Sequence, residues 1–509
     1  MWSALRRRGQ GAGDEPDGRP PRFRRPSRSP EKSQPSERLR IPQPLIRTRL
    51  PSGRGATEQP NVTSDGDTVL SPVFWMVLVA TGVAAGLFGD LLMWILFSVE
   101  HLAFGFNAGP LEDGVRHASD VRRLVSLLLA GLIGGVAWYL LRRYTGGERS
   151  EIDDSVWNGD GKLSFRRSLG TSVISEVIVG MGASLGREAA PKLMGGVSAS
   201  LLATWAQLPV GQRRLLVACG GGAGLAAVYN VPLAGALFTA EVMVGTLALP
   251  VVLPALACSG IATAVAWIYL PAHATYLDIP AYKFTLPLLV WSLLAGPVIG
   301  FIAAGYIRLI GWVSFYRFTG WRSIPAMVVA FGILALIGFA YPQLFGNGRD
   351  LAHDAFVGAG GFGLLLALFL LKPLVTALCL GSGATGGLFT PTFSTGAAFG
   401  GAAGVAWSLL WPGSPPGAYA LIGAAALVGA AMQAPLAGLA LTLELTHSGF
   451  QIMVPMLAAT VTATIVSRYI DGYSIYSARL PPHRGGPSRR ARPPGRPELQ
   501  GDTDGLETA

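Results

Sequence analysis

Residues 180–200 read Gly-Met-Gly-Ala-Ser-Leu-Gly-Arg-Glu-Ala-Ala-Pro-Lys-Leu-Met-Gly-Gly-Val-Ser-Ala-Ser. A glycine-rich break is followed here by three charged side chains, Arg187, Glu188 and Lys192, in a part of the chain that is otherwise apolar. A charged side chain at the centre of a membrane costs about 2.5–3.5 kcal/mol on insertion scales, so such residues are candidates for function. Whether Glu188 is one depends on whether this part of the chain lies in a membrane.

The composition favours a multi-pass membrane protein. Of the 509 residues, 50% are hydrophobic and only 14% are charged, whereas soluble proteins carry about 25% charged residues. The first long apolar run, residues 71–99, is long enough to cross a bilayer. Several later runs are shorter and are joined by glycine and proline, which predicts broken helices buried within a larger bundle.

Composition and charge divide the chain into five parts. We expect a disordered basic cytoplasmic tail at 1–69, a membrane repeat at 70–270, a connecting loop at 271–284, a second membrane repeat at 285–480 and a disordered cytoplasmic tail at 481–509. The fourteen Arg and Lys residues within 1–54 predict that both ends face the cytoplasm of a cell-membrane protein. We expect no folded domain, and so no CBS domains, after the second repeat, and no nucleic-acid partner.

Two segments indicate that the halves of the chain are related. Residues 230–241 read Asn-Val-Pro-Leu-Ala-Gly-Ala-Leu-Phe-Thr-Ala-Glu, and residues 433–444 read Gln-Ala-Pro-Leu-Ala-Gly-Leu-Ala-Leu-Thr-Leu-Glu. Pro-Leu-Ala-Gly, the Thr and the Glu match at one offset, and a weaker match pairs 186–191 with 387–391. We therefore expect an all-α multi-pass membrane protein made of two homologous, inverted repeats of tilted and broken helices, although the inversion itself depends on half-crossings that sequence does not count. Transporter repeats place the substrate site where interrupted segments meet.

The two breaks provide the chemistry of an anion site. Gly186 and Gly387 each precede a fresh helical run, and the unpaired N–H groups at a helix start together carry about half a positive charge. Two such starts facing one point would bind an anion without a fixed full charge, so the anion could leave again. Glu188 would compete with the anion when ionised and would move aside when protonated.

Three other interpretations stay open. Glu188 could form a structural ion pair with Arg187 or Lys192. The second interpretation is an intramembrane serine protease, because Gly182-Ala183-Ser184-Leu185-Gly186 fits the Gly-x-Ser-x-Gly pattern of serine hydrolases. The third is a transporter of organic solutes. We expect no enzyme and no metal site, because the pattern is weak in a glycine-rich chain and the three cysteines have no metal-ligand spacing.

Three motifs resemble those of one family. Gly186-Arg187-Glu188-Ala189-Ala190-Pro191 resembles the Gly-Lys/Arg-Glu-Gly-Pro motif of the CLC family of chloride channels and proton/chloride antiporters, 387–391 its Gly-x-Phe-x-Pro motif, and Ile475-Tyr476-Ser477 its tyrosine-containing terminal helix. The matches stand in the family's order and cover about residues 71–480. The resemblance implies that Glu188 is the gating and proton-accepting residue and that the protein is a homodimer in the lipid bilayer, with one pore per subunit. It implies an anion site at Gly147, Gly186, Arg187, Leu388, Phe389 and Tyr476.

Three departures from the family pattern bear on mechanism. Residues 146–150 align with the family's Gly-Ser-Gly-Ile-Pro motif, so Gly147 replaces the anion-coordinating Ser, and Ala189-Ala190 replaces Gly-Pro. Glu241 matches the first of a Glu-Glu pair, and Val242 takes the position of the family's proton glutamate. This favours a passive chloride channel, with bound chloride ions and no other cofactor; a proton-coupled chloride or anion antiporter is the alternative.

Overall fold

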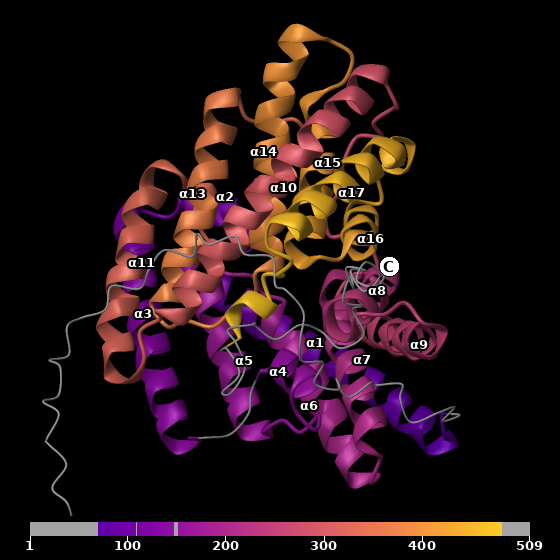
Figure 1. Cartoon of the computed structure of the whole chain (residues 1–509). Coiled ribbons are helices and arrows are strands. Elements are labelled where there is room, and N and C mark those ends of the chain that lie inside the picture. The colour runs from indigo at the N-terminus through magenta and orange to yellow at the C-terminus, as the bar shows by residue number, and fades with distance from the viewer. Residues whose placement is uncertain (1–69, 108, 147–150, 481–509) are drawn as a thin grey trace, which may run out of the picture. The chain divides into compact units, whose positions relative to one another are not determined.

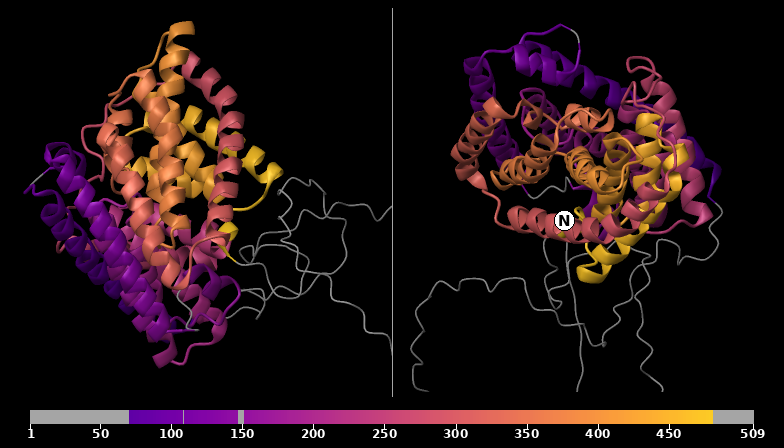
Figure 2. Two further views of the ribbon diagram at one scale, coloured as in Figure 1. Left: turned by 90° about the vertical axis from the view of Figure 1, so that its left-hand side faces the viewer. Right: turned by 90° about the horizontal axis from the view of Figure 1, so that it is seen from above.

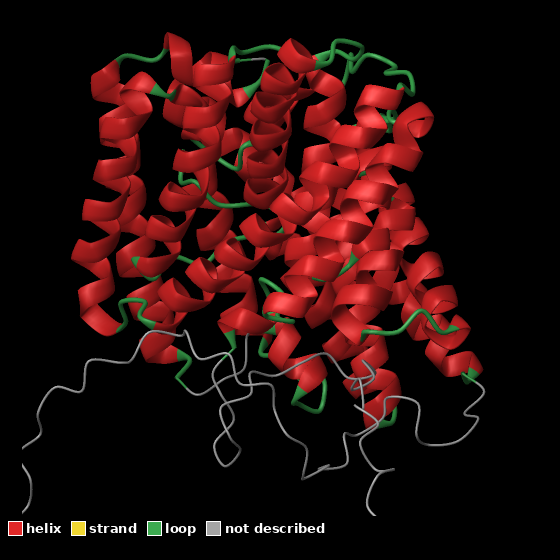
Figure 3. Ribbon diagram, turned by 45° about the horizontal axis from the view of Figure 1, so that its top comes forward, coloured by secondary structure: helices red, strands yellow, loops and turns green. Residues whose placement is uncertain are grey.

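The computed structural model describes residues 70–107, 109–146 and 151–480, which all belong to one compact unit. The two predicted tails and Gly147 lie outside the described residues. Every regular element of the described part is a helix (Figure 3). Eight of these described helices are long and apolar enough to cross a membrane.

The first half of the chain contains nine α-helices within its described residues (Figure 1). They are α1 (Pro72–Phe104), α2 (Leu111–His117), α3 (Asp120–Tyr144), α4 (Ile152–Trp157), α5 (Phe165–Gly180), α6 (Ala189–Trp205), α7 (Val210–Tyr229), α8 (Pro232–Phe238) and α9 (Leu249–Ala266). A π-helical turn, η1 (Thr239–Val244), continues α8.

The second half follows the same order. Its helices are α10 (Leu286–Phe315), α11 (Ser323–Ala340), α12 (Arg349–Phe356), α13 (Phe362–Gly381), α14 (Phe389–Leu410), α15 (Pro416–Met432), α16 (Pro435–Thr446) and α17 (Met453–Ile470). Four single 3₁₀ turns complete it: η2 (Gly320–Arg322), η3 (Pro342–Leu344), η4 (Phe450–Ile452) and η5 (Ser477–Arg479).

Hydroxyl side chains fix several helix starts. The side chain of Ser71 accepts a hydrogen bond from the Phe74 amide at 3.1 Å, and Pro72 occupies the first helical position of α1. Thr285 caps α10 in the same way. A side-chain oxygen before the first turn satisfies an amide that has no partner within the helix, and proline is pre-set for that position.

Equivalent helices pack in equivalent pairs. In the first half α1 packs on α9 and α6 on α7, and in the second half α10 packs on α17 and α14 on α15. At the α6–α7 contact, a Cβ on Gly195 would collide with the carbonyl of Gly220, and at the α14–α15 contact a Cβ on Gly396 would collide with that of Gly423. Small residues let membrane helices approach this closely, so much of the high glycine content serves packing.

The two halves are joined along their length. In Figure 1 and in the two views of Figure 2, the indigo-to-magenta first half and the orange-to-yellow second half lie against each other. Helix α3 packs on α11, and α8 packs on α16. The Glu241 carboxylate accepts hydrogen bonds from the amides of Leu436 and Ala437, the latter at 2.7 Å.

Glu444 makes the same contacts in the opposite direction. Its carboxylate accepts from the amides of Leu233 at 3.1 Å and Ala234 at 2.7 Å. Each repeat therefore supplies a carboxylate to the helix start of the other repeat, where an anion is stabilised. These contacts give the two matched glutamates a structural role.

The sequence reading was incomplete in the connections and at the end of the second repeat. The polar residues 100–120, which follow the first apolar run, contain the end of α1 and all of α2. The short helices α4 and α12 were also not predicted. The prediction of a terminal helix around Tyr476 was wrong in extent, because only the 3₁₀ turn η5 forms there.

Candidate anion site

The two glycine-rich breaks lie side by side. The amide of Gly186 donates to the carbonyl of Gly387 at 2.8 Å, and the amide of Gly387 donates to the carbonyl of Gly186 at 2.8 Å. The chain reaches this contact in the same way from both halves, because Gly182 after α5 and Gly383 after α13 have φ of +108° and +102°. Glycine adopts such angles without steric cost.

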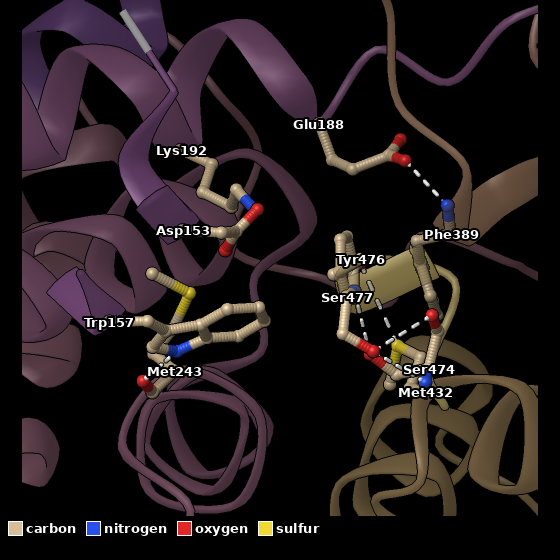
Figure 4. A network of polar contacts seen from close by, with 10 residues as sticks. All are labelled: Asp153, Trp157, Glu188, Lys192, Met243, Phe389, Met432, Ser474, Tyr476 and Ser477. Carbon is tan, nitrogen blue, oxygen red and sulfur yellow. Dashed lines mark hydrogen bonds and ion pairs between the residues drawn. The ribbon is translucent and has the colours of Figure 1, made fainter. Parts of the chain in front are cut away.

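Glu188 occupies the point where the two helix starts meet. It is 4% exposed, and its Oε1 accepts a hydrogen bond from the amide of Phe389, at the start of α14, at 2.7 Å. Its Oε2 accepts from the hydroxyls of Tyr229 and Thr390, each at 3.2 Å (Figure 4 shows the contact with Phe389). The carboxylate thus sits among neutral donors at the N-terminus of a helix, where an anion is favoured.

Both glycines of the contact are needed for this position. A Cβ added to Gly186 or to Gly387 would meet the carboxylate of Glu188. The glycines therefore open the space that the carboxylate fills. A small anion in the same place would meet the same amide and hydroxyl donors, since it would need the same close approach to the backbone.

Tyr229 and Thr390 were missed in the sequence analysis. Tyr229 is the last residue of α7, and its hydroxyl lies 2.6 Å from that of Thr390. A usable signal existed for each of them: Thr390 lies inside the second break, and Tyr229 is a hydroxyl-bearing side chain that ends a helix of glycine and small apolar residues just before the repeated segment. Sequence alone does not say that α7 ends beside α14.

Neither cation beside Glu188 in sequence pairs with its carboxylate. The guanidinium of Arg187 lies over the rings of Tyr229 and Phe97, at 5.0 and 5.8 Å from their centroids, a cation–π arrangement. The ammonium of Lys192 pairs with Asp153 at 3.1 Å. The interpretation of Glu188 as a structural ion pair with Arg187 or Lys192 is wrong in this structure.

A cavity of about 110 Å³ leads to Glu188. Its wall includes Gly387, Leu388 and Tyr476, together with part of α3, α4, α5 and α6. Among the described residues that line it, the cationic ones are Arg142, Arg167, Lys192, Arg317 and Arg479, and the acidic ones are Glu151, Asp153 and Glu188. The excess of positive charge raises the local concentration of anions.

The remaining predicted residues lie around the same region. Tyr476 is 6% exposed, its ring packs edge-on against Phe238, and its hydroxyl lies 3.8 Å from the sulfur of Met432. Val242 is buried in the π-helical turn η1, as part of the segment that also holds Glu241. Single π turns are frequent at functional positions.

The geometry around Ser184 argues for a structural role. Ser184 is fully buried and accepts a hydrogen bond from the ammonium of Lys372 at 2.9 Å. That ammonium also donates to the carbonyls of Gly346 at 2.9 Å and Leu344 at 3.3 Å. A lysine that activates a serine must accept a proton, whereas three acceptors around one ammonium hold its protons in place.

Fold and site together define a multi-pass membrane protein in which two broken helices meet around one anionic group. Comparison with known families then identifies it. The family model described as "Voltage gated chloride channel" matches residues 127–468, which is more than half of the chain. The chain therefore belongs to this family, the CLC family of chloride channels and transporters.

Individual relatives agree with this assignment. The voltage-gated ClC-type chloride channel ClcB of Citrobacter koseri is 27% identical over 432 residues, which cover 81% of this chain and 100% of that protein. The H(+)/Cl(-) exchange transporter ClcA of Yersinia pestis is 29% identical over 377 residues, covering 70% of this chain and 77% of that protein. A solved slow cyanobacterial Cl−/H+ antiporter has a similar fold, with a TM-score of 0.70 and 22% identity over 80% of this chain and 97% of that one.

Proposed function

We propose that this protein carries chloride across the membrane through a pore that the side chain of Glu188 closes and opens. The observation that carries the proposal is the hydrogen bond from the amide of Phe389 to the Glu188 carboxylate. The carboxylate takes the place of an anion at a helix start. When it accepts a proton it loses its attraction to the helix start, the side chain leaves, and a chloride ion takes the vacated donors.

The donors around Glu188 suit permeation. They are an amide and two hydroxyls, the groups of Phe389, Tyr229 and Thr390, and none of them carries a full charge. A pore must bind its ion firmly enough to admit it and weakly enough to release it. The binding site is proposed to include the amides of Leu388 and Phe389 and the hydroxyl of Tyr476, with Gly186 and Arg187 shaping it. Gly147, outside the described residues, would add its backbone.

We favour passive conduction because Val242 cannot carry a proton. It stands where the family's antiporters have a proton glutamate, and Glu241 beside it accepts hydrogen bonds from α16. The alternative, a proton-coupled chloride or anion antiporter, is favoured by Glu176 on α5. Glu176 is fully buried, neither of its carboxylate oxygens has a hydrogen-bond partner among the described residues, and α5 packs on α6, the helix that Glu188 precedes. An acid in that environment is a candidate proton carrier.

One experiment separates these readings. Purified protein in liposomes is given a chloride gradient, and chloride flux and internal pH are recorded together. Passive conduction predicts chloride flux without proton movement, whereas proton uptake against its gradient, driven by chloride, would establish the antiporter. Substituting fluoride, nitrate or an organic anion for chloride identifies the ion carried.

The role of Glu188 is tested separately. Glu188→Gln removes the charge and keeps the size, so we expect flux that is faster and independent of pH. The gating role fails if the rate and the pH dependence both stay as in the wild type. Ser184→Ala should leave flux intact, because the proposal assigns no chemistry to Ser184.

The surroundings of the pore are part of the proposal. We propose a homodimer in the cell membrane with one pore per subunit, both termini in the cytoplasm, and bound chloride ions as the only cofactor. The support is the family resemblance and the arginine-rich N-terminal residues. Cysteine-specific labelling of residues near each end, from outside and from inside intact cells, tests the orientation.

A further inference from the structure

Lys192 projects from the same face of α6 as Glu188. The amide of Lys192 donates to the carbonyl of Glu188 at 3.1 Å, and residues four apart lie above one another on a helix. Lys192 is 8% exposed and lines the cavity that leads to Glu188. A nearly buried ammonium therefore stands one helical turn from the proposed gate.

The hydrogen-bond partners of this ammonium do not engage all of its N–H donors. Its Nζ lies 3.2 and 3.1 Å from the two carboxylate oxygens of Asp153, on α4. Asp153 is its only hydrogen-bond acceptor in the part of the chain that the structure describes, and the two N···O contacts account for two of the three N–H donors of the ammonium. At least one donor is available to a ligand.

The ammonium also faces the opposite wall of the cavity. Its Nζ lies 4.4 Å from the ring centroid of Tyr476 and 5.6 Å from that of Phe238. Figure 4 shows Asp153 and Lys192 on one side, Tyr476 and Phe389 on the other, and Glu188 above them. The charge is thus directed into the space that an ion must pass on its way to Glu188.

A purely structural role explains this pair poorly. Taking two charges out of water costs several kcal/mol per ion, and a well-packed apolar pair is often at least as stable. The side chains of Lys192 and Asp153 keep only 11% and 14% of their surface, and both border the cavity. The cost is understandable if the ammonium binds something that enters the cavity.

We propose that the ammonium of Lys192 is an anion ligand on the path to Glu188, and that Asp153 is the counter-charge that keeps its hold weak. The proposal rests on the proposed anion transport and names a residue that sets affinity. An anion approaching Tyr476 takes the available N–H of Lys192, and Asp153 prevents the full positive charge from trapping it. Binding and release are both served, as conduction requires.

Chloride binding to purified full-length protein, measured by isothermal titration calorimetry, tests this with three variants. Lys192→Met should weaken binding by about tenfold or more, because hydrogen bonds to charged groups are the strong ones. Asp153→Asn should strengthen it, because the ammonium then lacks its counter-charge. The double variant, which leaves no unpaired carboxylate to disturb folding, should bind as weakly as Lys192→Met.

The double variant also decides against a structural role. If Lys192 serves only to neutralise Asp153, the double variant regains wild-type affinity, and the proposal is overturned. Equal affinity in all four proteins overturns it too. A wild type that neither binds nor carries chloride would instead refute the proposed function. Lys162→Met is the matched control, since Lys162 pairs with Asp160 at 3.7 Å at an exposed position, and it should leave chloride binding unchanged.

Discussion

Replacing Tyr229 with Phe is expected to loosen the closed position of Glu188. The change removes one hydroxyl and keeps the ring that lies beneath Arg187 and beside Phe389. The lost hydrogen bond to the carboxylate measures 3.2 Å, near the long end of the normal range. Bonds to charged groups are worth about 1.5–3 kcal/mol, so the low end, about 1.5 kcal/mol, applies. That corresponds to about a tenfold shift between the closed and open positions of the side chain.

Chloride efflux from liposomes measures this shift. We expect Tyr229→Phe to raise the efflux rate by up to about tenfold at a pH where Glu188 is ionised, and by progressively less as the pH falls, because a protonated Glu188 is already released. A double-mutant cycle with Glu188→Ala isolates the contact. In that background the increase should be absent, because the carboxylate that the hydroxyl holds is gone, and any change that remains reports the hydroxyl as a ligand of the anion. An equal increase with and without the Glu188 carboxylate would mean that Tyr229 acts elsewhere, and the reasoning would be refuted.

Three further predictions concern the surroundings of the pore. Gly387→Ala should place a methyl group in the space that the Glu188 carboxylate and a small anion share, and so lower chloride flux, whereas Gly363→Ala, where a Cβ meets nothing within 4 Å, should leave flux unchanged. Glu444→Ala removes the acceptor of two amides at the start of α8 and should cost about 1–2 kcal/mol, seen as a lower Tm in detergent, with a smaller loss for Glu444→Gln. Burial and then the Asp354 carboxylate raise the pKa of Glu112, on the connecting helix α2, to about 7 from an ordinary 4.5, although Arg116 opposes the shift. Glu112 therefore contributes all of its stabilisation below pH 4.5 and loses that contribution as the pH rises through about 7. The Tm of the wild type should fall over that range, and the Tm of Glu112→Gln should fall less.

The helices of the membrane part were predictable because their signals are local. Apolar runs, prolines at helix starts and the repeated Pro-Leu-Ala-Gly segment are properties of neighbouring residues. The two breaks were predictable as a pair because the same pattern occurs twice. The short amphipathic helix α12 was not, since half of its eight residues, Arg349–Phe356, are polar and the segment is too short to show a clear helical pattern.

The residues that make up the site were harder to predict from the sequence, because the site depends on contacts between distant segments. Glu188 and Phe389 could be named from the breaks that contain them. Tyr229 reaches Glu188 only because α7 ends beside the start of α14, and Lys192 finds Asp153 across a gap of 39 residues. The local pattern allowed an ion pair between Glu188 and Lys192, and only the packing of α4 against the rest of the first half selects Asp153 instead.

Two kinds of hydrogen-bond donor lie along the proposed path of the anion, neutral donors at Glu188 and a charged donor at Lys192. At Glu188 the donors are an amide and two hydroxyls, which are neutral groups. In the proposed function, a single protonation of Glu188 therefore decides whether the carboxylate or a small anion occupies them. At Lys192 the donor is a full charge, and a carboxylate 3.1 Å away offsets it. A full positive charge without that offset would hold an anion longer than transport allows. A site made only of neutral donors would attract anions less strongly from the cationic cavity. The proposed path of the anion therefore has two steps. The anion is first attracted by the charged pair Lys192–Asp153, and it then exchanges with the protonatable carboxylate of Glu188.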